Sequence, residues 1–268
     1  MTGATGTHGR PGDLNEGRWL NVARPNPEAL LRLFCFPYAG GSALIYRSWP
    51  QHLPPGVEVC AVQLSGRGQR INEPPLRSLD ALIPALAAAL RPHLDRPFAF
   101  FGHSMGALVS FELARYLRGH GGAAPEHLFV SGHAAPRPGR RREKIFDLPE
   151  PEFKEQLRRL NGTPHEVLEH PELMELLLPL LRADFSVCDT YVYAERQPLD
   201  CPITAFGGLG DASVSREDVE AWAAQTAGDF SVRMLPGDHF FLHESEALLL
   251  NLLGRELTHI VTRLTPTR

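Results

Sequence analysis

The chain has 268 residues, of which 43% are hydrophobic and 22% charged, and its formal net charge is −4 at pH 7. This composition is typical of a globular protein with one large core, and the negative balance argues against a nucleic-acid-binding protein. The four cysteines lie far apart, without disulfide or metal-ligand spacing, so we expect reduced core residues, no metal site and a cytoplasmic protein.

The N-terminal segment is predicted to be a flexible tail over residues 1–24. Residues 1–18 are rich in Gly and Thr and lack the apolar segment of a secretion signal. No apolar run in the sequence reaches the length of a membrane span, so we expect no membrane association.

Beyond the tail, short apolar runs alternate with helical segments, the pattern of a mostly parallel sheet covered by helices on both faces. The expected strands are residues 31–36, 57–64, 98–101, 127–131, 203–206 and 230–235. The expected helices are residues 79–90, 105–118, 216–227 and 246–263. Pro84 should kink the first of these helices or delay its start. The pattern predicts an α/β fold, with an α/β-hydrolase core over residues 25–136 and 199–268.

The alternation stops over residues 137–198, which show helical periodicity and no clear strand. One helix is expected over residues 151–160, ended by Asn161 and Gly162, and a longer one from Pro171 past Leu181. Its leucines follow a spacing of three and four residues, which fits packing on the main domain or the lining of an apolar tunnel. We interpret the segment as a helical lid insertion.

A nucleophile is indicated by the pentapeptide from Gly102 to Gly106, which has Ser104 at its centre. It follows an apolar strand and opens a helix, as expected of a G-x-S-x-G nucleophile elbow. The glycines flank a crowded turn in which a Cβ would clash. Ser104 is therefore the candidate nucleophile.

A serine hydroxyl needs a base to activate it, and the base needs an acid to fix its tautomer. His239 and Asp211 each follow an expected strand, as Ser104 does, so all three should lie at one edge of a parallel sheet. The order Ser, Asp, His is that of α/β-hydrolases. Asp184, within the insertion, is the alternative acid. We expect a structural role for His103 and a surface or supporting role for His243. Asp238 adjoins His239 in the sequence, which makes a direct bond between the two side chains geometrically awkward.

The negative charge that develops on a carbonyl oxygen needs oriented donors. The first should be the backbone N–H of Met105, at the start of a helix. The second should come from the Gly-rich loop over residues 37–43, with Ala39 as the expected donor and Tyr38 as the alternative.

Four segments in this order resemble the type II thioesterases of polyketide synthases and nonribosomal peptide synthetases, which are similar to the thioesterase II of animal fatty-acid synthesis. They are residues 34–43, 62–70, 101–107 and 235–242. The resemblance implies Ser104, Asp211 and His239 as the triad and Ala39 and Met105 as the oxyanion donors. One departure is that Asp211 precedes Ala212, where the family usually has proline.

The resemblance also implies the substrate, which is an acyl group on the phosphopantetheine arm of an acyl or peptidyl carrier protein. Aberrant or stalled groups would be removed by hydrolysis, without a cofactor of the enzyme's own. We expect a monomer, and a basic run could dock the acidic carrier: Arg137, Arg140, Arg141, Arg142 and Lys144. Such a run is also typical of a solvated surface. The same triad would serve a carboxylesterase or lipase, and a catalytically silent interaction protein could keep the same fold.

Overall fold

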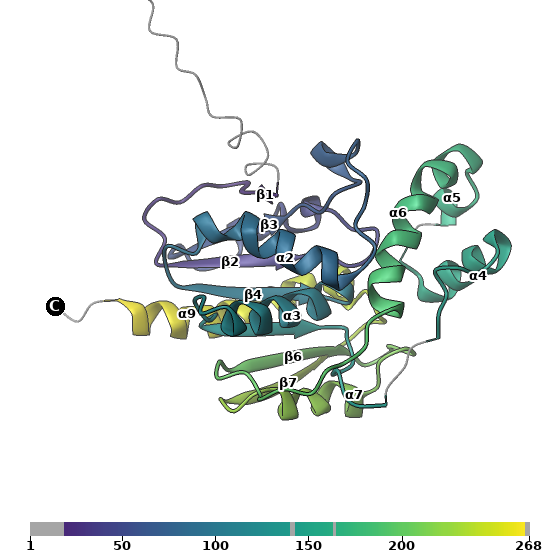
Figure 1. The fold of residues 1–268 in the computed structure, drawn as a ribbon. Helices are drawn as coiled ribbons and strands as arrows, with labels where there is room; N and C mark the ends of the chain where they lie inside the picture. Colours follow the sequence, from purple (N-terminus) through teal and green to yellow (C-terminus); the bar gives the residue numbers. More distant parts are fainter. Residues whose placement is uncertain (1–18, 140–142, 163–164, 266–268) are drawn as a thin grey trace, which may run out of the picture.

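A computed structural model describes residues 19–139, 143–162 and 165–265 (Figure 1). Its strands form one seven-stranded sheet in the order β1-β3-β2-β4-β5-β6-β7. All neighbours are parallel except β1 and β3. The strands are β1 (Leu20–Asn21), β2 (Leu31–Phe36), β3 (Val57–Val62), β4 (Phe98–His103), β5 (His127–Ser131), β6 (Ile203–Gly208) and β7 (Phe230–Leu235). The α/β-hydrolase fold is confirmed.

The helices in the described ranges lie on both faces of this sheet and at the carboxyl ends of its strands (Figure 1). They are α2 (Leu79–Leu90), α3 (Met105–Gly119), α4 (Glu150–Leu160), α5 (His165–Leu168), α6 (Pro171–Asp189), α7 (Arg216–Glu220), α8 (Phe241–Glu244) and α9 (Glu246–Leu264). Short 3₁₀ helices complete the set: Ala43–Tyr46, Trp49–Gln51, Gly68–Arg70, Arg91–His93 and Ala221–Gln225. None of the helices in the described ranges is long and apolar enough to cross a membrane.

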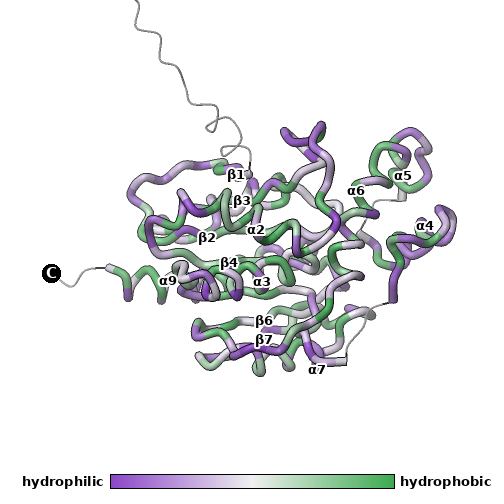
Figure 2. Tube along the Cα trace, in the orientation of Figure 1, coloured by the Kyte–Doolittle hydropathy of each residue, from purple (hydrophilic) through white to green (hydrophobic). Residues whose placement is uncertain are grey.

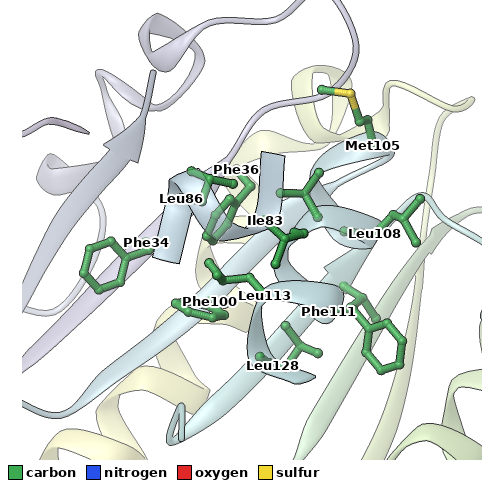
Figure 3. Packing of buried hydrophobic residues seen from close by; sticks show 14 of the residues in the cluster. Phe34, Phe36, Ile83, Leu86, Phe100, Met105, Leu108, Phe111, Leu113 and Leu128 are labelled. Carbon is green, nitrogen blue, oxygen red and sulfur yellow. The ribbon is translucent and has the colours of Figure 1, made fainter. Parts of the chain in front are cut away.

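Both faces of the sheet are apolar, because successive side chains of a strand point to opposite faces. Phe100 packs with α2 and α3 on one face, where Leu86 and Leu113 lie close to it (Figure 3). Phe101, the next residue, packs with Leu253 of α9 on the other face. These two layers fix the carboxyl ends of the strands, where the polar candidates lie.

The predicted insertion contains α4, α5 and α6, which lie beyond the carboxyl ends of the strands (Figure 1). They share a separate apolar cluster that includes Phe153, Leu157 and Phe185. Most of α4 is hydrophilic, whereas α6 carries long apolar stretches (Figure 2). The leucine stripe of α6 is divided: Leu181 is buried, whereas Leu176 is 62% exposed.

Two expectations about segment ends were wrong. The tail does not extend to residue 24, because Trp19 is buried and Leu20–Asn21 pair with β3; residues 1–18 lie outside the described chain. Of the two effects expected of Pro84, the late start is wrong, since α2 begins at Leu79 and contains Pro84. Pro84 lies on the exposed side of the helix, where water can bond the carbonyl that a proline leaves without a donor.

Candidate active site

Ser104 lies at the sharp turn between β4 and α3. Its φ of 51° and ψ of −116° are strained for a residue with a Cβ, and its N–H donates to Ser131 O at 2.8 Å. A Cβ on Gly102 would lie 2.1 Å from Gly106 O, and one on Gly106 would lie 2.1 Å from Phe36 O. Backbone thus crowds both glycines, and the turn presents the serine side chain to the cavity above it.

Three polar side chains that are distant along the chain meet at the ends of β4, β6 and β7. His239 Nε2 lies 2.9 Å from Ser104 Oγ, and His239 Nδ1 lies 2.7 Å from Asp211 Oδ2. The Asp211 side chain is 1% exposed and the His239 side chain 12%. A proton can pass from the hydroxyl to the imidazole, while the carboxylate orients the ring and stabilises its charge.

Asp211 accepts hydrogen bonds on both carboxylate oxygens. In addition to His239 on Oδ2, Oδ1 accepts from Ser213 Oγ at 2.7 Å, Ser213 N at 2.8 Å and Val214 N at 3.1 Å. Burial alone would raise the pKa of Asp211, but the bonds from His239 and Ser213 outweigh it and hold the pKa below its usual value. The carboxylate is therefore charged at neutral pH. The sequence patterns did not single out Ser213.

Asp184, the alternative acid, does not contact His239. It lies in α6 and binds Arg67 through both oxygens, at 2.6 Å each. Asp238 accepts from Phe240 N at 2.7 Å, so its carboxylate is also engaged elsewhere.

The other two histidines near the site surround the triad without joining it. His103 is fully buried, and its Nδ1 lies 2.9 Å from Ser131 Oγ. Burial, with a smaller effect of the His239 charge, lowers the pKa of His103 well below its usual value, so this ring is neutral. His243 Nε2 lies 3.0 Å from Tyr38 Oη, and Tyr38 directly precedes Ala39.

Ser104 opens into a small cavity, which we call the serine cavity. Its volume is about 40 Å³. Ala39 and Met105, the expected oxyanion donors, line it beside Ser104. The N–H groups of a helix's first turn have no partner within the helix, so that of Met105 can bind a substrate oxygen. The remaining walls are mostly apolar and come largely from the insertion: Leu157, Leu160, Gly162, Leu181, Phe185 and Cys188.

A second cavity of about 370 Å³, the side cavity, adjoins the first. The two share His239, Leu160 and Cys188. The side cavity carries polar groups from several elements, including Tyr193 and Ser213. Ala39 and Met105 do not line it. His239 therefore stands between a small, mostly apolar space and a larger one with both polar and apolar walls.

The part of the chain that the structure describes contains no cluster of three His, Cys, Asp or Glu side chains able to hold a metal ion. The site itself contains a serine, a histidine, a carboxylate and backbone N–H groups, which are the components of acyl-transfer chemistry.

Known proteins similar to this chain were found by family, by sequence and by structure. The model of the thioesterase domain family matches residues 31–255. "Linear gramicidin dehydrogenase LgrE" of Brevibacillus parabrevis is 50% identical over 247 residues, which are 91% of this chain and 94% of LgrE. The RedJ thioesterase from the prodiginine pathway of Streptomyces coelicolor is 42% identical, with a TM-score of 0.81, over 87% of this chain and 96% of that one. The type II thioesterase BorB, from the borrelidin cluster, is 38% identical with a TM-score of 0.80, over 89% and 97%.

Proposed function

This chain belongs to the thioesterase family, and we propose that it hydrolyses acyl groups from the phosphopantetheine arm of carrier proteins through an acyl-Ser104 intermediate. Its type II resemblance is confirmed by relatives such as BorB. The observation that carries the proposal is the relay at Ser104, with 2.9 Å to His239 and a further 2.7 Å to Asp211. The acids released would be stalled or aberrant groups of a polyketide or nonribosomal peptide assembly line.

In the first half of the reaction, Ser104 Oγ attacks the thioester carbonyl carbon and His239 Nε2 takes its proton. The carbonyl oxygen becomes negative and accepts from the N–H groups of Ala39 and Met105. When the tetrahedral intermediate collapses, the C–S bond breaks. The departing sulfur takes the proton from His239 and leaves as the thiol of the phosphopantetheine arm. A thiolate is a good leaving group, so less proton donation is needed than for an amide.

In the second half, His239 takes a proton from a water molecule, which attacks the acyl-Ser104 carbonyl carbon. Collapse of this second intermediate breaks the bond to Ser104 Oγ, and His239 returns the proton to the serine. The carboxylate of Asp211 stays ionised and keeps the imidazole in one tautomer throughout. None of the proposed reaction steps uses a cofactor.

We assign the two cavities from the position of His239. Ser104 and both proposed oxyanion donors line only the serine cavity, whereas the side cavity also reaches His239, so the side cavity is the space left for the arm and its leaving sulfur. The acyl group, whose carbonyl oxygen must meet Ala39 and Met105, then occupies the serine cavity. A space of about 40 Å³ favours a group the size of acetyl or propionyl, and a longer chain would need more room than this cavity provides.

The proposed partner is an acidic carrier protein, for which the basic run offers a docking surface. The Arg137 side chain is 55% exposed, and its Nη2 lies 3.4 Å from Asp218 Oδ1. Lys144 is exposed. Arg140, Arg141 and Arg142 lie outside the described residues. Long-range attraction of this kind raises the association rate and weakens with salt.

The name of LgrE calls that protein a dehydrogenase, which is a different activity from hydrolysis. The site of this chain offers a nucleophile, a base and oriented N–H donors, which are what acyl transfer needs. Hydrolysis is therefore the function that the site supports best.

The test is a panel of acetyl, propionyl, octanoyl and aminoacyl carrier proteins, with p-nitrophenyl esters of matched chain length. We expect faster release from the carriers and a loss of about a million-fold in kcat with Ser104→Ala or His239→Ala. Ser110→Ala is the matched control, because Ser110 lies in α3, the helix that Ser104 precedes, and its hydroxyl donates to Ala107 O. Preference for the oxygen esters would indicate an esterase, and full activity of Ser104→Ala would refute the serine mechanism.

A further inference from the structure

A buried ion pair joins α6 of the insertion to the sheet core. Arg67, in the loop after β3, donates from Nη2 to Asp184 Oδ1 and from Nη1 to Asp184 Oδ2, both at 2.6 Å. The two side chains are 5% and 2% exposed. A buried pair of charges adds little stability over an apolar pair of similar size, so stability alone does not account for it.

The same two side chains also bind the backbone of the loop after β2. Asp184 Oδ2 accepts from Gly40 N at 2.7 Å, and Arg67 Nη1 donates to Gly41 O at 3.1 Å. Gly40 and Gly41 directly follow Ala39, whose N–H is the proposed second oxyanion donor. The ion pair thus holds the peptide groups next to that donor.

The loop forms a tight turn with Ala39 and Gly40 at its centre. Gly41 N donates to Tyr38 O at 2.9 Å, and Gly40 has a φ of +78°, as in a type II turn. Type I and type II turns differ by a rotation of the central peptide, which here links Ala39 to Gly40. The N–H of that peptide is the group that Asp184 binds, so this bond selects between the two turns.

Helix α6 also packs directly on this turn. A Cβ at Gly40 would lie 2.7 Å from Leu181 Cδ2, one helical turn before Asp184. Leu181 lines the serine cavity. The position of α6 therefore sets both the wall of the cavity and the conformation of the loop.

We propose that Asp184, held by Arg67, is a positioning residue that keeps the Ala39 N–H directed at the thioester carbonyl oxygen. The inference rests on the proposed function, from which the role of Ala39 is taken. The acceptor for Gly40 N lies on α6. If α6 is displaced, the turn that carries Ala39 therefore loses the hydrogen bond that holds its central peptide. The second oxyanion donor is then fully placed only when α6 is seated on the core.

The competing explanation is that the Arg67–Asp184 ion pair only attaches α6 to the core and affects the stability of the fold alone. Two variants separate the explanations: Asp184→Asn, and the double variant Arg67→Met with Asp184→Leu. Replacing both buried charges with apolar side chains generally preserves stability and leaves the net charge unchanged, but Gly40 N loses its acceptor. The control is Glu58→Gln, which breaks the Arg32–Glu58 pair of 2.9 Å at the opposite ends of the strands.

Two rates are measured below the melting temperature of every variant. One is hydrolysis of the acetyl thioester of N-acetylcysteamine, and the other is labelling of Ser104 by a fluorophosphonate, whose phosphoryl oxygen also occupies the oxyanion hole. We expect both Asp184 variants to lower kcat and the labelling rate about ten- to hundred-fold, with KM within two-fold of the parent. The pH profile of the double variant should match that of the parent, and Glu58→Gln should change neither rate more than two-fold.

The proposal is overturned if the double variant keeps the parental kcat and labelling rate, or if its loss lies in KM alone. A parent chain that labels rapidly and hydrolyses no thioester would refute the proposed function instead. In that case the labelling rates of the variants still decide the role of Asp184.

Discussion

Ser213 Oγ donates to Asp211 Oδ1 at 2.7 Å and also lies 3.2 Å from His239 Nδ1, so one hydroxyl contacts both the acid and the base. Because its bond to the carboxylate stabilises the charged form, Ser213→Ala should raise the pKa of Asp211 and lower kcat by about two- to ten-fold. Steady-state kinetics on an acetyl thioester check this. Ser213→Thr keeps a hydroxyl and should retain kcat within two-fold. Equal losses in both variants would contradict a role for the hydroxyl.

The two carboxylates that the sequence offered as the acid should respond very differently. Asp211→Asn removes the group that fixes the His239 tautomer and should lower kcat roughly ten-thousand-fold. Asp184→Asn leaves the relay intact and should lower kcat only about ten- to hundred-fold. Measuring kcat for both variants at one pH is sufficient. A larger loss from Asp184→Asn would exchange the two assignments.

Much of the site could be predicted because its residues follow strands that the apolar pattern reveals. Ser104, Asp211 and His239 each come shortly after such a run, and parallel strands bring their carboxyl ends to one edge. The type of fold then follows from the alternation of strands and helices. Backbone strain at Ser104 was likewise implied by its flanking glycines.

Long-range pairing could not be predicted in the same way. Arg67 and Asp184 are 117 residues apart, and no periodicity links them. Strand β1 has two residues and runs antiparallel, so it offers too short a pattern to recognise. Ser213 acts through a local turn around Asp211, which depends on side-chain geometry rather than on a motif.

Gly106→Ala should destabilise the fold, because the new Cβ would lie 2.1 Å from the backbone oxygen of Phe36. Neither chain can move without disturbing β2 or α3, so we expect a loss of about 3 kcal/mol in the free energy of unfolding. Urea unfolding followed by circular dichroism measures it. Gly119→Ala in the same helix is the control, since nothing lies within 4 Å of its Cβ; it should gain up to ~1 kcal/mol. Equal changes in the free energy of unfolding in the two variants would contradict the close contact at Gly106.

The buried His127 should make stability depend on pH. Burial, with a smaller effect of Arg263, lowers its pKa from 6.5 to about 4, so the unfolded chain binds more protons between these values. Stability from this group is complete above pH 6.5 and decreases toward pH 4, by up to about 1.4 kcal/mol per pH unit. His103 acts in the same direction. Urea midpoints between pH 5 and 7 should therefore fall less steeply in His127→Gln, with kcat at pH 7 unchanged; an identical slope would contradict this.

Asn161 ends α4 with a φ of 55°. Its side chain joins the insertion to the loop between β7 and α8, which carries His239. Its Nδ2 donates to Asp238 Oδ2 at 2.9 Å, beside the base. Asn161→Gly tolerates the positive φ and removes only the side-chain bond, worth about 1 kcal/mol. With the acyl group in the serine cavity, as proposed, a long chain needs more room than about 40 Å³, so a bond that holds the insertion should oppose binding of long chains more than of short ones.

We therefore expect Asn161→Gly to lower KM for an octanoyl thioester by up to about five-fold and to leave KM for an acetyl thioester within two-fold. Glu169→Gln is the matched control, because it removes the charge from an exposed 2.6 Å bond between Arg158 and Glu169, both within the insertion. Both thioesters are compared in one assay with each variant. If acetyl and octanoyl respond equally to Asn161→Gly, the bond to Asp238 does not restrain the insertion, and chain length must be limited by the cavity walls themselves.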